Sequence, residues 1–124
     1  MKDFLILASI ILLLDLLWLK YAVKNLWEDN VRSVQKSDMK VDVKYALLSY
    51  IVIILGIYMF VVKKTTSVKE GMIYGFVYGF ILYAVFDLTN LAIFKDFSLR
   101  TAVIDMLWGG VLTSVAVGVT KYLV

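Results

Sequence analysis

The chain has 124 residues, of which 62% are hydrophobic and 19% are charged. It is too short for two ordinary domains and too apolar for a soluble one, so we expect a single membrane domain over residues 1–124. The absence of Cys and His removes the commonest metal and haem ligands, and we expect no metal and no cofactor. The net charge of +3 comes from Lys and Arg beside apolar runs, where they meet lipid headgroups, so we expect no nucleic-acid partner.

Four apolar runs are long enough to cross a bilayer as helices. We place these spans at about residues 4–23, 45–62, 68–94 and 99–123. Ser67 and Glu70 have the spacing of a capping box at the start of the third span, and Ser98 is a candidate cap for the fourth. The expected fold class is therefore all-α, an integral membrane bundle of four transmembrane helices.

The longest polar stretch, residues 24–44, joins the first two spans. Trp27, Val31 and Val34 fall at helical spacing within it, so one interpretation is a short interfacial amphipathic helix with Trp27 at headgroup depth. An ordinary solvated loop is the alternative, because so few positions in the stretch are apolar.

Four spans place both termini on the same side of the membrane. The side that carries the first and third loops holds eight basic residues, and the other side holds five. The eight are Lys20, Lys24, Arg32, Lys36, Lys40, Lys44, Lys95 and Arg100; the five are Lys2, Lys63, Lys64, Lys69 and Lys121. Because cytoplasmic loops carry an excess of Lys and Arg, this bias favours cytoplasmic first and third loops and termini outside.

Asp15, Asp87 and Asp105 lie inside three of the spans, and no Lys or Arg lies deep in any span. A carboxyl near the bilayer centre costs on the order of 2.5 to 3.5 kcal/mol, so it usually persists because it holds helices together or has a function. The topology places all three acids in one half of the bilayer, about 7 to 12 Å from the surface that carries the first and third loops. We therefore expect them to converge in one site.

Each acid has a polar or amphipathic companion three residues later, on its own helical face: Trp18, Asn90 and Trp108. Indole and amide N–H groups are donors that can stabilise a carboxylate, and the phenol of Tyr83, one turn before Asp87, adds another. The predicted polar site comprises Asp15, Trp18, Tyr83, Asp87, Thr89, Asn90, Asp105 and Trp108.

A line of small residues follows one face of the third span, at Gly71, Gly75 and Gly79. The fourth span has a matching line at Gly110, Ser114 and Gly118. Faces without side chains let two helices approach closely, so we expect these spans to pack on each other. A homo-oligomer or membrane partner held by the same glycines is the alternative.

Three segments of the chain resemble the signature segments of a family of predicted membrane proteins called domain of unknown function 2177. They are Asp15–Leu19 (DLLWL), Tyr83–Ala92 (YAVFDLTNLA) and Asp105–Gly109 (DMLWG). Their order and spacing, with the four-span layout, extend the resemblance over nearly the whole chain. The resemblance implies a small four-helix membrane protein and falls on the same aspartates, but it supplies no mechanism.

Two interpretations of the acids follow. In the first, they bind or pass a proton or small cation, with the indole, phenol and amide groups orienting them. In the second, the polar residues are interhelical hydrogen-bonding glue in a structural or lipid-associated assembly protein. An enzyme acting on lipid is the least favoured class, because the chain has no His, Cys or recognisable nucleophile arrangement.

Overall fold

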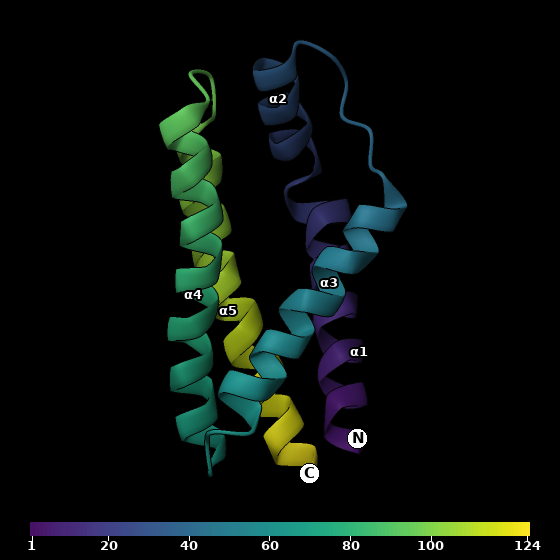
Figure 1. Cartoon of the computed structure of the whole chain (residues 1–124), viewed down its shortest axis with the longest axis vertical. Helices are drawn as coiled ribbons and strands as arrows, with labels where there is room; N and C mark the ends of the chain where they lie inside the picture. The colour runs from purple at the N-terminus through teal and green to yellow at the C-terminus, as the bar shows by residue number, and fades with distance from the viewer.

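The computed structural model describes residues 1–124 as a bundle of helices without strands (Figure 1). Four helices are long and apolar enough to cross a membrane: Lys2–Ala22, Val43–Val62, Val68–Ile93 and Leu99–Leu123. The shortest has 20 residues. At 1.5 Å per residue such a helix extends about 30 Å, the thickness of a hydrocarbon core. The all-α fold class predicted from the sequence is confirmed.

The first two of these helices each end in a π-helical segment. Helix α1 (Lys2–Leu17) continues into η1 (Trp18–Ala22), and α3 (Val43–Ile57) continues into η2 (Tyr58–Val62). A π-helical turn is rare and often marks a functional position, because it shifts the side chains that follow around the helix axis. Segment η1 begins three residues after Asp15, at the edge of the polar region described below.

The other two spans are regular helices, α4 (Val68–Ile93) and α5 (Leu99–Leu123), and serine caps begin both. The hydroxyl of Ser67 accepts a hydrogen bond from the Glu70 amide at 3.1 Å, and that of Ser98 accepts one from the Thr101 amide at 3.1 Å. Each cap satisfies a backbone donor that the first turn of a helix leaves unpaired.

Helices α4 and α5 lie side by side along their length, because small residues line the face between them (Figure 1). Gly71, Gly75 and Gly79 are all buried on α4. A Cβ atom added to Gly75 would lie 3.1 Å from the carbonyl oxygen of Thr113 and 3.3 Å from the Cα of Ser114. The glycine face of α4 is thus covered by α5.

The glycines of α5 make room for side chains of α4 in the same interface. A Cβ added to Gly110 would lie 2.8 Å from the Phe76 ring, and one added to Gly118 would lie 2.6 Å from the Cγ of Met72. The homodimer alternative requires an open glycine face on α4, whereas in this fold the facing helix occupies it.

The apolar core fills the half of the bundle that contains both chain termini (Figure 1). Its buried members come from α1, α3, η2 and α5: Leu7, Ile11, Ile54, Ile57, Val61, Val62, Leu112, Ala116 and Val117. Toward the opposite end α3 leans away from α4, so side chains of that half do not close into a second core of this kind (Figure 1). The three intramembrane aspartates lie in that half.

The polar stretch after the first span contains helix α2 (Lys24–Gln35), which attaches to the turn between α4 and α5. The buried side chain of Asn30 accepts a 2.8 Å hydrogen bond from the amide of Ser98, and Lys36 forms a 3.0 Å ion pair with Asp96. Trp27 meets Phe97 edge-on, with ring centroids 6.1 Å apart. With these contacts to the turn before α5, α2 is aligned with the long axis of the bundle instead of lying across it (Figure 1).

Candidate functional site

The three intramembrane aspartates come from three helices and lie at similar depth. Asp15, Asp87 and Asp105 are each six or seven residues from the end of their helix nearest α2, which corresponds to about 10 Å. Their exposed fractions are 7%, 0% and 9%. Close packing of α4 on α5 brings Asp87 and Asp105 together, and α1 adds Asp15 from the other side of α5.

The carboxylate of Asp15 accepts hydrogen bonds from two other helices. The indole Nε1 of Trp108, on α5, donates to its Oδ1 at 2.8 Å, and the hydroxyl of Tyr50, on α3, donates to its Oδ2. Asp15 therefore joins α1 to both α3 and α5. A buried carboxylate with two donors is largely compensated for its loss of water.

Trp18 has a different role from the one that its spacing suggests. Its ring stacks on Trp108, with centroids 4.2 Å apart and planes 5° from parallel, and its buried Nε1 has no acceptor. Trp108 in turn donates to Asp15 and not to Asp105 on its own helix. Residues three apart share a helical face, but here the stacking of the two rings fixes the orientation of both indoles. The carboxylate that Trp108 reaches is therefore that of Asp15, on the neighbouring helix.

Asp87 and Asp105 form the unsatisfied part of the site. Asp87 is completely buried, and neither of its carboxyl oxygens has a donor within reach. Its close polar neighbour is the carboxyl of Asp105, which lies within hydrogen-bonding reach. Two carboxylates cannot donate to each other, so this contact becomes a hydrogen bond only when a proton lies between them.

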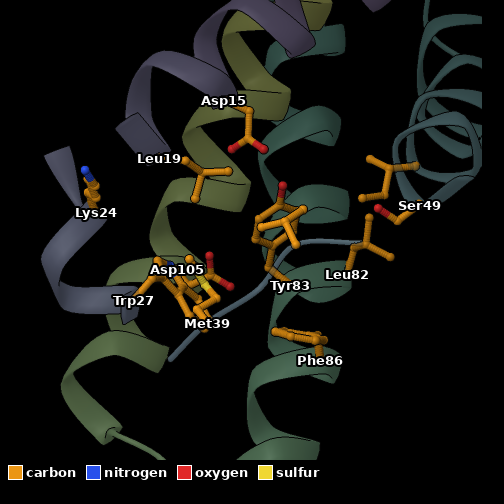
Figure 2. A pocket seen from close by; sticks show the side chains of 12 residues that line it. Asp15, Leu19, Lys24, Trp27, Met39, Ser49, Leu82, Tyr83, Phe86 and Asp105 are labelled. Atoms are coloured by element: carbon orange, nitrogen blue, oxygen red, sulfur yellow. The ribbon is translucent and has the colours of Figure 1, made fainter. Parts of the chain in front are cut away.

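Tyr83 lies among the three aspartates, and its hydroxyl points toward Asp15 (Figure 2). Gly109 makes room for it, since a Cβ at that position would lie 2.6 Å from Cδ1 and 2.7 Å from Cβ of the Tyr83 side chain. Gly109 ends the segment Asp105–Gly109 that carries the family resemblance, but it is not among the predicted packing residues, although it directly precedes Gly110.

Two predicted site residues do not bind a carboxyl. Thr89 is exposed on α4, where its side chain faces away from the bundle, and Asn90 is half-buried with no hydrogen bond from its amide to Asp87. Asn90 follows Asp87 by three residues, but the carboxyl of Asp87 is directed toward α5 and Asp105 instead.

Tyr50 is the site residue that sequence reasoning missed. A signal was present, because Tyr50 stands seven residues inside its span from the same end of the bundle as Asp15 does. A phenol and a carboxyl at matching depth on two packed helices are natural partners. No Lys or Arg forms an ion pair with Asp15, Asp87 or Asp105.

A cavity of about 520 Å³ adjoins the acids between α3 and α4 (Figure 2). Asp15, Tyr83 and Asp105 line its inner side, whereas Asp87 lies behind them and does not reach it. Most of the remaining lining is apolar. Asp105 therefore stands between the buried oxygens of Asp87 and the cavity.

Four apolar helices surrounding buried carboxyls define a small multi-pass membrane protein that resides in a lipid bilayer. The chain belongs to the family described as predicted membrane protein DUF2177, whose model matches residues 1–122. The resemblance seen in the sequence is thereby confirmed. No curated protein and no solved structure matches the chain.

Proposed function

We propose that this protein binds a proton inside the membrane, held between the carboxyls of Asp87 and Asp105. The observation that carries the proposal is the complete burial of Asp87 without a donor to either oxygen, beside a second acid. An ionised carboxylate buried without a partner is very costly, and a proton shared with Asp105 removes one charge and supplies the missing hydrogen bond.

A proton fits this pair better than a metal ion does. A cation such as Ca²⁺ takes six to eight oxygen ligands, and no group of three or more acidic side chains is close enough to hold a metal. A proton needs only the two facing oxygens. The proposed ligand is therefore the simplest of the small cations expected from the sequence.

The packing favours binding from one end over passage through the bundle. Asp105 faces the cavity, but the half of the bundle beyond the acids is filled by apolar side chains such as Leu7, Ile11 and Leu112. A proton relay needs a continuous chain of polar groups or water, whereas the buried hydroxyls of α5 in that half, Thr113 and Thr120, are seven residues apart, which is about 10 Å along the helix. We therefore assign Asp87 and Asp105 to reversible proton binding from the α2 end.

The structural interpretation applies to Asp15. Its two donors come from α3 and α5, so its interactions are those of interhelical hydrogen-bonding glue. The acids thus divide between two roles: Asp15 holds helices together, and Asp87 with Asp105 binds the proton.

Infrared difference spectroscopy of the purified protein in lipid tests this assignment. At neutral pH we expect the carbonyl band of a protonated carboxyl, which Asp87→Asn and Asp105→Asn each remove, because the new amide donates to the remaining carboxylate. Asp15→Asn is the matched control and retains the band. A wild-type spectrum without the band, or a band that survives both substitutions, contradicts the proposal.

We also propose that the end of the bundle with α2 faces the cytoplasm and that both termini, which lie together at the other end, face outward (Figure 1). The eight basic residues of the first and third loops support this orientation.

The chain has no native Cys, so single cysteines report its orientation directly. We expect a membrane-impermeant maleimide to label Thr66→Cys in intact cells and to label Ser37→Cys only after permeabilisation. Both positions are exposed in loops at opposite ends of the bundle. The reverse pattern of labelling would invert the orientation.

A further inference from the structure

The cavity beside the acids has the form of a small-molecule site. Its volume of about 520 Å³ lies within the usual range for such sites, about 300 to 1,000 Å³. Its apolar walls come from α2 and the segments that flank it, from α3 and from α4, and include Trp27, Met39, Ile53, Leu82 and Phe86. These walls suit an apolar body more than a hydrated ion.

The inner side of the cavity carries an unpaired negative group. Asp105 is only 9% exposed, receives no hydrogen bond from a protein donor, and lines the cavity (Figure 2). Lys24 lines the cavity too, but it forms no ion pair with Asp105. The cavity therefore lacks a cationic hydrogen-bond donor at this position.

We propose that the cavity binds an amphipathic amine, with its protonated amino group at Asp105 and its apolar body against the walls. A proton-sharing pair of Asp87 and Asp105 keeps one negative charge, which one ammonium group neutralises; in this respect the inference rests on the proposed function. Asp15 and the hydroxyl of Tyr83 line the same inner side and accept further N–H donors.

Other occupants fit less well. A hydrocarbon chain contacts the apolar walls but leaves the charge of Asp105 without a cationic partner, and an anion meets two carboxyls of like charge. A bare metal ion leaves the apolar walls unused. Helices α3 and α4, which supply Ile53 and Leu82 to the cavity lining, diverge toward this end of the bundle (Figure 1).

Three probes with one biphenyl body test the inference by equilibrium dialysis against the full chain in detergent micelles, with empty micelles as the partition blank. They are 4-phenylbenzylamine, 4-phenylbenzyl alcohol and biphenyl-4-carboxylate. We expect saturable binding of the amine, binding of the alcohol weaker by at least about tenfold because it lacks the charge-assisted hydrogen bond, and no binding of the carboxylate.

Variants then locate the site. Asp105→Asn is expected to lower the affinity for the amine to that for the alcohol. Leu82→Trp, and independently Ser49→Trp at the exposed rim, are expected to fill the cavity and to abolish binding of both the amine and the alcohol. Val85→Trp is the matched control, because Val85 is 62% exposed on the outer face of α4, and it binds the amine as the wild type does.

Equal affinity for amine and alcohol, or an amine affinity unchanged by Asp105→Asn, overturns the inference. The infrared band separates this failure from that of the proposed function. If the infrared band is present but the amine does not bind, only the proposed ligand is rejected. If the amine binds in a way that depends on Asp105 but the band is absent, only the shared proton is rejected.

Discussion

Gly79→Ala is expected to destabilise the protein by about 3 kcal/mol, the upper part of the usual range for overpacking. An added Cβ would meet the carbonyl oxygen of Gly109 and lie 2.7 Å from the Cβ of Thr113. Both obstacles belong to the backbone or the inner side chains of α5, so α4 and α5 must separate to admit one methyl group. That separation also moves Asp87 from Asp105. Unfolding by denaturing detergent, followed by circular dichroism, measures the loss.

Gly56→Ala is the control for this prediction. The added Cβ there meets only the far end of the Tyr78 side chain, at 2.6 Å from its hydroxyl oxygen, and that side chain can move aside. Alanine in a helix is favoured over glycine by about 1 kcal/mol, so we expect Gly56→Ala to be neutral or mildly stabilising. Equal stability of the two variants would mean that α4 and α5 do not depend on close glycine contact.

Most of the fold follows from patterns within single helices. The lengths of the apolar runs and the serine caps at Ser67 and Ser98 are local properties, and both reappear in the structure. The glycine spacing on α4 is equally local, and it correctly indicates the face that meets α5. Placing the acids in one half of the bundle needed only the helical rise and the topology.

The pairing of side chains across helices is what the sequence does not predict. Spacing along one helix assigned Trp108 to Asp105 and Asn90 to Asp87, whereas Trp108 donates to Asp15 and Asp87 faces Asp105. Which side chain pairs with each carboxyl depends on how each helix is rotated about its axis relative to its neighbours. That rotation is set by packing contacts such as the Trp18–Trp108 stack, which have no signature in a single sequence.

The cavity is also beyond sequence reasoning. Its walls combine Leu82 and Phe86 of α4 with Ile53 of α3, and these residues are indistinguishable by type from their lipid-facing neighbours. The lean of α3 decides which of them face inward. The attachment of α2 through Asn30 likewise requires the position of the α4–α5 turn.

The largest contrast among the polar residues is expected between Asp15→Leu and Asp105→Asn. Asp15→Leu leaves the half-buried donors of Trp108 and Tyr50 without an acceptor, at about 1 to 3 kcal/mol each, so we expect a loss of about 2 to 6 kcal/mol. Asp105→Asn gives Asp87 the amide donor that it lacks, and we expect stability within about 1 kcal/mol of the wild type or above it. Detergent unfolding measures both.

A double-mutant cycle with Tyr50→Phe shows whether the loss comes from the hydrogen bond itself. Alone, Tyr50→Phe is expected to destabilise by about 1 to 2 kcal/mol, because Asp15 keeps only Trp108 as a donor. In the Asp15→Leu background the same change removes a donor that is already unpaired, so it should be neutral or stabilising. Additive losses in the double variant would mean that Asp15 and Tyr50 contribute independently, and the assignment of Asp15 to helix association would fail.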